Sequence, residues 1–400
     1  MVAAIVTWLA TFVVRKAAKR FSIIVMPDDR RVHEAPTPTI GGSGMFAGFL
    51  VAMAVASQLP GLHPVFRGNS EPLGLVIGAA VIFAVGLIDD VHEMSPPAKV
   101  SGQVLAGMVL YLSGVTMIFF HVPILSTTVS LSPQASPLVT VLWVVGMANA
   151  INLIDGLDGL AAGIVAIASI TFFVYAHALL SNGDIGLSNS GPLVAIVCLG
   201  LCLGFLAHNF PHPARIFMGD AGAMLLGLLM AASTMSVVGQ TPEDFSSKTY
   251  FLFAPIVIPF IILGIPILDT AFALLRRGFR GGNPAVADKN HLHHRLMKLG
   301  HGHTWSVVLL WVWTAILSAV VVYPELVHRN TLLVPIGVVA LGVVLYTLFA
   351  PRGRQLASAR TTAGAHDAPD PPTAASEPAT AASKGQRTGA ASASEDPQSA

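Results

Sequence analysis

The chain has 400 residues, of which 54% are hydrophobic and only 11% are charged, and its mean hydropathy is +0.70. A soluble domain carries about 25% charged residues, so this composition excludes an ordinary soluble protein and indicates a polytopic helical membrane protein. The net charge of +1, with no basic cluster interleaved with aromatic residues, predicts no nucleic-acid partner.

Apolar runs near 20 residues long predict an all-α fold with about eleven transmembrane helices. The expected spans lie near residues 1–14, 40–59, 73–89, 100–120, 138–154, 159–180, 192–209, 221–239, 250–275, 304–323 and 332–350. The first run is short for a bilayer, and because Lys and Arg follow it instead of preceding it, we expect no cleavable signal peptide. Cys198 and Cys202 lie four positions apart in one apolar run, so we expect two buried thiols, not a disulfide or metal site.

The distribution of Lys and Arg predicts the orientation in the membrane. With the N-terminus outside, 14 of the 22 basic residues fall in inner loops, 3 in outer loops (Arg67, Lys248 and Arg329), and 5 after residue 350. We therefore expect the N-terminus outside, the C-terminus inside, and the acidic and His-rich motifs at the cytoplasmic face.

Residues 351–400 differ in composition from the rest of the chain. Ala, Ser, Pro and Gly fill 30 of these 50 positions, without Ile, Val or aromatic residues. Such a segment cannot bury enough apolar surface to offset its conformational entropy. The predicted organisation is a transmembrane domain over residues 1–350 and a disordered cytoplasmic tail over 351–400 that does not carry catalysis.

Polar residues gather where the predicted spans meet the inner face, beginning with the loop MPDDRRVHEAPTPTIGG. Its Arg30, Arg31 and His33 suit an anionic substrate or lipid headgroup, although positive-inside sorting accounts for the arginines equally well. In GLIDDVHEMSPPAKVSGQ, Asp89 and Asp90 end the third span and Lys99 opens the fourth. Adjacent carboxylates at a helix C-terminus repel each other and the helix dipole, which favours a functional cation at this point.

The stretch VGMANAINLIDGLDGLAAG, residues 145–163, carries two carboxamides and two carboxylates at the mouth of an apolar segment: Asn149, Asn152, Asp155 and Asp158. A polar turn alone would account for Asn, Asp and Gly here. Because charged groups within the bilayer are costly, and similar acidic interruptions occur elsewhere in the chain, we favour a functional site.

Two further segments contribute candidate ligands. Asp220, in HNFPHPARIFMGDAG, suits either a helix N-cap or a metal–phosphate site beside a helix N-terminus. The segment ADKNHLHHRLMKLGHGH is rich in His but has no Cys. Since the other candidate ligands are hard oxygens, Mg²⁺ or Mn²⁺ is expected instead of zinc, with the imidazoles near Arg295 and Lys298 as phosphate donors. Asp269 either pairs with a basic group or lines the site.

These segments together resemble the polyprenyl-phosphate N-acetylhexosamine-1-phosphate transferase family. The resembling pieces are DDRRVHEAPTPTIGG, GLIDDVHEMSPPAKVSGQ, NAINLIDGLDGLAAG, FMGDAGAMLLG and DKNHLHHRLMKLG, in the family's order over about residues 27–300. Eleven spans and the composition of the His-rich loop fit the branch that uses UDP-N-acetylglucosamine. The tail after residue 350 matches no motif of the family.

The resemblance implies that a polyprenyl phosphate attacks the β-phosphorus of a UDP-N-acetylhexosamine at the inner membrane face and releases UMP, with Mg²⁺ or Mn²⁺ as cofactor. Asp220 is the first candidate metal ligand, joined by Asn152 and Asp89. Asp89 and Asp90 would position or deprotonate the lipid phosphate, while Asp155 and Asp158 would bind the nucleotide sugar or align the attack. The substrate-binding residues implied are Lys99, Asn149, Asn209, His291, His293, His294 and Arg295. A homodimer is also expected.

Two alternatives remain open. A phospho-N-acetylmuramoyl-pentapeptide transferase would share the chemistry but use a larger, more acidic donor. A membrane transporter would place ionisable groups near mid-membrane between two related halves, and no internal repeat is seen in this sequence. Whether the attack is direct or passes through an aspartyl intermediate also stays open.

Overall fold

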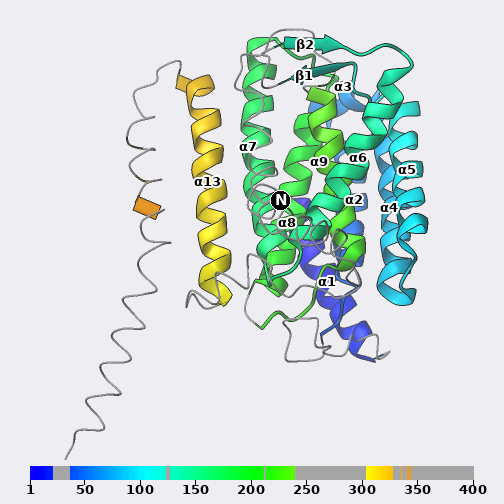
Figure 1. The fold of residues 1–400 in the computed structure, drawn as a ribbon, viewed down its shortest axis with the longest axis vertical. Helices are drawn as coiled ribbons and strands as arrows, with labels where there is room; N and C mark the ends of the chain where they lie inside the picture. Colours follow the sequence, from blue (N-terminus) through cyan, green and yellow to red (C-terminus); the bar gives the residue numbers. More distant parts are fainter. Residues whose placement is uncertain are drawn as a thin grey trace, which may run out of the picture. The chain divides into compact units, whose positions relative to one another are not determined.

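A computed structural model of the chain describes residues 1–20, 37–122, 127–210, 213–237 and 303–327, together with the single positions 239, 335, 339, 342 and 343. All of these belong to the compact unit Met1–Gln355. The described part is mostly helical, as the composition predicts, and Figure 1 shows its helices running roughly side by side.

The helices have well-defined bounds in the described part of the chain. The longer ones are α1 (Val2–Arg20), α2 (Gly42–Ala56), α4 (Glu71–His92), α5 (Pro96–Leu112), α6 (Ala135–Ile154), α7 (Leu160–Asn182), α8 (Gly191–Asn209), α9 (Gly219–Val237) and α13 (His303–Val327). A short 3-10 turn (Pro60–Leu62) and α3 (His63–Phe66) follow α2.

Five of these helices are long and apolar enough to cross a membrane: α4, α6, α7, α8 and α9. A sixth is counted if α2 and the segment Pro60–Phe66, which are bent by 95° to each other, form one span. Nine of the eleven predicted spans coincide with described helices. The predicted span 250–275 lies outside the described residues, and only four single positions of 332–350 are described, so the count of eleven and the orientation stay predictions.

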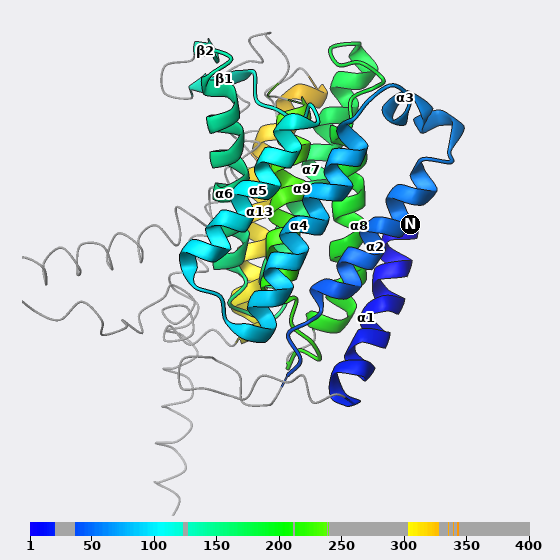
Figure 2. The ribbon, with the colours of Figure 1, turned by 90° about the vertical axis from the view of Figure 1, so that its right-hand side faces the viewer.

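Helix α9 forms the centre of this bundle, where every residue from Ala221 to Val237 is buried. It packs against α2, α4, α6, α7 and α8, and Figures 1 and 2 show these helices around it. Small residues permit the close packing, since a Cβ on Gly227 would lie 2.5 Å from Ala148 Cα of α6. A central helix enclosed on all sides holds the residues at its N-terminus in fixed positions.

The predicted ends of two spans are wrong. The first helix extends to Arg20, past the predicted residue 14, because basic residues are favourable near a helix C-terminus. The predicted span 100–120 begins at Pro96 and ends at Leu112, where Gly114 adopts a φ of +96° that breaks the helix. The apolar run then continues as strand β1 (Phe119–Val122), paired antiparallel with β2 (Thr127–Ser130). Hydropathy alone does not distinguish an apolar helix from an apolar strand.

The strand pair and the candidate site lie at opposite ends of the bundle (Figure 1). The C-termini of α4 and α6 and the N-termini of α5 and α9 all reach one end. These four helix termini, which are far apart in the sequence, therefore lie close together in space. They carry the predicted site residues.

Candidate active site

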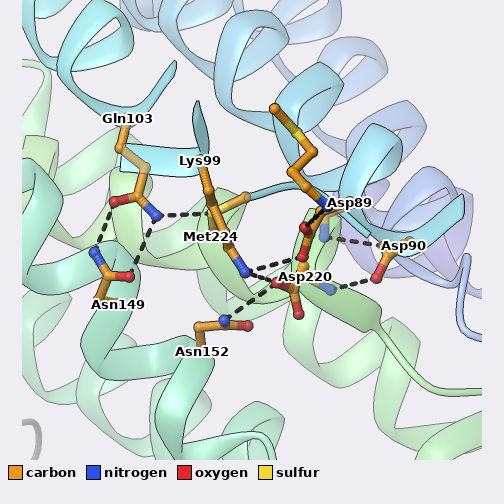
Figure 3. Close-up of polar contacts among 10 residues, drawn as sticks. Asp89, Asp90, Lys99, Gln103, Asn149, Asn152, Asp220 and Met224 are labelled. Atoms are coloured by element: carbon orange, nitrogen blue, oxygen red, sulfur yellow. Dashed lines mark hydrogen bonds and ion pairs between the residues drawn. The ribbon is translucent and has the colours of Figure 1, made fainter. Parts of the chain in front are cut away.

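The centre of the candidate site is the ammonium group of Lys99, near the start of α5. Its Nζ lies 3.1 Å from Asp89 Oδ2 and forms a second ion pair with Asp220 Oδ2. Figure 3 shows the lysine reaching toward both carboxylates from a neighbouring helix. The side chains of these three residues are between 16% and 27% exposed, so the charges are only partly screened by solvent. The carboxylates of α4 and α9 thus converge on one cation.

Asn152, at the end of α6, completes this group. Its amide nitrogen lies 3.3 Å from Asp220 Oδ2. Rotating the amide by 180° suits the surroundings better, because its nitrogen then donates to Asp220 Oδ1 at 3.1 Å and its oxygen lies 3.2 Å from Lys99 Nζ. We call Asp89, Asp90, Lys99, Asn152 and Asp220 the carboxylate cluster. Asp89, Asn152 and Asp220 then offer three oxygens to one central cation.

Asp90 makes contacts different from those of its neighbour Asp89. Its Oδ1 accepts the Asp220 N–H at 2.7 Å, and its Oδ2 accepts the Ala221 N–H at 3.1 Å. These amides belong to the first turn of α9, where N–H groups have no partner within the helix. Gly219, at φ +67°, makes the approach feasible, because a Cβ there would lie 2.5 Å from Asp90 Oδ1. Asp90 therefore fixes the backbone that carries Asp220.

This arrangement accounts for the acidic pair at the end of α4. A helix C-terminus disfavours carboxylates, but here the positive end of α9 and the ammonium of Lys99 compensate the two charges. Asp89 Oδ1 also accepts the Met94 N–H at 2.7 Å, which closes the chain over the helix end. Glu93, in that turn, has a φ of +44°, an unfavourable conformation for a residue with a side chain.

Asp155 lies just beyond the last residue of α6 and is partly buried. Burial raises the pKa of its carboxyl group to about 7, and the negative charges of Asp90 and Asp158 act in the same direction. Between pH 6 and 8 this group therefore changes its charge, unlike an ordinary aspartate.

Asp158 and Asn209 are buried between two loops at the same end of the bundle. Asp158 Oδ2 accepts the Ala214 N–H at 3.0 Å. Asn209 Oδ1 accepts the Gly159 N–H at 2.8 Å, and its Nδ2 donates to the Ile216 carbonyl at 3.0 Å. With 3% and 2% exposure, respectively, both side chains join the loop after α6 to the loop after α8. Their predicted substrate contacts stay predictions.

Asn149 lies one turn before Asn152 and pairs with a residue that the sequence analysis did not single out. Its Nδ2 donates to Gln103 Oε1 at 2.6 Å, and Gln103 Nε2 donates to Asn149 Oδ1 at 3.4 Å. A polar residue four positions after Lys99 in an apolar run was the available signal for Gln103. The predicted role of Asn149 in substrate binding is likewise untested.

The remaining predicted residues lie outside the described part of the chain. They are Arg30, Arg31, His33, Asp269, His291, His293, His294, Arg295 and Lys298. Within the described residues, no three or more His, Cys, Asp or Glu side chains form a group that could hold a metal. The donor set that does converge there is mixed: two carboxylates and one amide oxygen, a chemistry that suits a hard divalent cation.

Known proteins resemble this chain over most of its length. The profile of glycosyl transferase family 4 matches residues 72–238, which include the whole carboxylate cluster. A decaprenyl-phosphate N-acetylglucosaminephosphotransferase of Mycolicibacterium smegmatis is 38% identical over 323 residues, covering 80% of this chain and 79% of the relative.

Two further relatives come from other bacteria. A probable undecaprenyl-phosphate N-acetylglucosaminyl 1-phosphate transferase of Bacillus subtilis is 39% identical, over 78% of this chain and 81% of its own. An undecaprenyl-phosphate alpha-N-acetylglucosaminyl 1-phosphate transferase of Escherichia coli K12 is 27% identical, over 80% of this chain and 82% of its own.

Proposed function

The chain belongs to glycosyl transferase family 4, and from this premise we propose that it transfers N-acetylglucosamine 1-phosphate to a polyprenyl phosphate in the membrane. The donor is UDP-N-acetylglucosamine and the products are polyprenyl-diphosphate-N-acetylglucosamine and UMP. The observation that carries the proposal is the meeting of Asp89, Lys99, Asn152 and Asp220 at one end of a bundle of apolar helices. The relatives named for this reaction support the assignment.

The reaction needs a site with both signs of charge. An oxygen of the lipid phosphate attacks the phosphorus attached to the sugar, and the bond from that phosphorus to the bridging oxygen of the diphosphate breaks. UMP leaves with the bridging oxygen. Lys99 is the cation of the carboxylate cluster, and its ammonium is suited to bind a phosphate oxygen. The exposed helix ends let a phosphate headgroup reach this point while its apolar chain stays among lipids.

Asp89, Asn152 and Asp220 would hold a divalent cation, since their oxygens already face one ammonium group. When bound, Mg²⁺ or Mn²⁺ would neutralise charge on the diphosphate oxygens. Asp155 is our candidate for accepting or holding a proton near neutral pH, because its pKa of about 7 suits that role. His291, His293, His294 and Arg295 are proposed phosphate contacts on the resemblance alone.

The membrane setting of this reaction also forms part of the proposal. The chain is a multi-pass membrane protein, and the excess of Lys and Arg in the predicted inner loops supports a cytoplasmic site in the inner or plasma membrane. A site at the cytoplasmic face would be accessible to the nucleotide sugar, which is a water-soluble donor. A homodimer is also proposed, and no contact within the described residues bears on it.

The test is UMP release by the purified protein with polyprenyl phosphate, Mg²⁺ and one donor at a time. We expect turnover with UDP-N-acetylglucosamine and a kcat/KM at least several-fold lower with UDP-N-acetylmuramoyl-pentapeptide. A preference for the pentapeptide donor would identify the sister reaction and leave the site chemistry standing. Absence of UMP with either donor, in a folded preparation, would favour the transporter alternative.

A further inference from the structure

A layer of polar contacts lies one helical turn from the carboxylate cluster, farther from the helix ends that carry the cluster. Gln103 follows Lys99 by four residues on α5, and Met224 follows Asp220 by four on α9. Asn149 precedes Asn152 by three on α6. Residues three or four positions apart lie on the same face of a helix. Each residue of this layer therefore lies on the same helix face as the cluster residue one turn away from it. Figure 3 shows the Gln103 amide in contact with both Asn149 and Met224.

Gln103 uses its whole amide group in these contacts. Its oxygen accepts from Asn149 Nδ2 at 2.6 Å, while its nitrogen donates to Asn149 Oδ1 at 3.4 Å and to Met224 Sδ at 3.0 Å. The side chain is 0% exposed. A buried amide is costly unless its groups are hydrogen-bonded, so the geometry that satisfies Gln103 is strongly preferred over a rotated or shifted one.

We propose that Gln103 is a positioning residue for the transfer reaction. By bonding α6 and α9 at the same point, it fixes how α5 is rotated and how far it lies from both. That geometry aims Lys99 and Asn152 at Asp220, because each lies on the same helix face as its layer partner. The inference rests on the proposed function and adds to it a residue that touches neither substrate.

A merely structural role for the amide is distinguishable from this one. Polar contacts between transmembrane helices contribute only modestly to their association, so removing one should leave the bundle folded. Gln103→Met conserves volume and flexibility but removes all three contacts. Asn149 is exposed and keeps its own contact with the Val145 carbonyl at 2.8 Å, so the variant strands no buried partner on α6.

The chain offers a matched control in another polar contact to the central helix α9. Ser169, on α7, is buried and donates from Oγ to Met230 Sδ at 3.3 Å. Ser169→Ala therefore removes a buried polar contact with a methionine of α9, but six residues farther along that helix than Met224. The kinetics and the metal affinity of Ser169→Ala should match those of the wild-type protein.

The experiment compares Mn²⁺ affinity, measured by electron paramagnetic resonance without substrates, and the kcat and KM for UMP release. For Gln103→Met we expect Mn²⁺ affinity and kcat each to fall by about 10- to 100-fold, the usual loss for a residue that orients metal ligands. The KM for UDP-N-acetylglucosamine should change by less than about threefold, because the substituted residue, Gln103, is fully buried and does not reach the donor. The double variant Gln103→Asn with Asn149→Gln exchanges the amides and should recover most of the lost Mn²⁺ affinity, which is measured without substrates.

Several outcomes would overturn the inference. The inference would be wrong if Gln103→Met had the same Mn²⁺ affinity and turnover as Ser169→Ala. A loss of Mn²⁺ affinity that the exchanged pair fails to recover would also overturn it. If Gln103→Met does not fold, the single variant Gln103→Asn, which keeps an amide but shortens its reach, is compared with the exchanged pair under the same criteria. Failure of the proposed function is a separate result: the wild type would then release no UMP, while the Mn²⁺ measurement would still test Gln103.

Discussion

Asp90 and Asp220 are joined through the backbone: the carboxylate of Asp90 accepts hydrogen bonds from the N–H groups of Asp220 and of the next residue, at 2.7 and 3.1 Å. Asp90 thus caps α9 from a different helix and leaves the Asp220 carboxylate directed at Lys99. The two adjacent carboxylates of α4 therefore have different partners. Asp89 forms an ion pair with Lys99, whereas Asp90 accepts hydrogen bonds from the backbone of α9.

This relationship predicts that Asp90→Asn lowers both activity and stability. An asparagine presents an N–H group to one of the two α9 amides, and loss of a helix cap costs about 0.5–2 kcal/mol. We expect turnover to fall by about 10² or more, because Asp220 shifts with its backbone. UMP release and thermal unfolding in detergent measure the two effects. Asp184→Asn, an exposed acid after α7, is the control and should change neither.

A second prediction concerns the cation. Activity should require Mg²⁺ or Mn²⁺ and vanish with excess chelator, because hard oxygen donors dominate the carboxylate cluster. Asp89→Asn and Asp220→Asn should each lower turnover by about 10² or more in folded protein. Full turnover in EDTA, or near-normal rates in both variants, would contradict the proposed ligands. Titration with Mn²⁺ separates weakened metal binding from a slower chemical step.

The raised pKa of Asp155 predicts a pH dependence of stability. The ordinary pKa of an aspartate is 3.8, whereas the pKa of the folded group is about 7, so the folded state holds an extra proton between these pH values. The stability that Asp155 contributes is present below about pH 4 and is lost as the pH rises through about 7. Wild-type protein should lose thermal stability relative to Asp155→Asn as the pH rises from about 4 to about 7. Parallel profiles for the two proteins would refute the shifted pKa.

Packing between α4 and α9 gives a fourth prediction. A Cβ on Gly86 would lie 2.8 Å from the Asp220 carbonyl carbon and nearer still to Ala221, and backbone atoms cannot move aside. Gly86→Ala should therefore lower the unfolding temperature and the turnover by widening the Asp90–Asp220 contact. Gly146→Ala in α6 is the control, because nothing lies within 4 Å of its added Cβ. Alanine also favours a helix over glycine by about 1 kcal/mol, so the control should be neutral or more stable.

The sequence predicts that the tail is dispensable, and truncation tests this directly. A protein ending after Ala350 keeps every predicted span and motif. Its UMP release should stay within about twofold of the full chain, since a segment of this composition has no packed core to contribute. A well-folded but inactive truncation would assign the tail a function that its composition does not indicate.

The sequence by itself determined the helical class, the positions of most described helices and the identity of the polar residues at their ends. Hydropathy is a local property, and Asp89, Lys99, Asn152 and Asp220 interrupt apolar runs at positions that can be read one segment at a time. It also placed Cys198 and Cys202 correctly as buried thiols. It failed at 113–120, where a glycine with positive φ ends a helix inside an apolar run that continues as a strand.

Only the tertiary structure decided what the polar residues contact. Asp90 meets the amide of a residue 130 positions away, and Gln103 meets a methionine 121 positions away. Asp158 and Asn209 face each other's loops, although in the sequence they resemble open site residues. Such contacts depend on which helices are neighbours and on how each is rotated. Those features are set by the packing of small residues around α9, which no single segment of the sequence specifies.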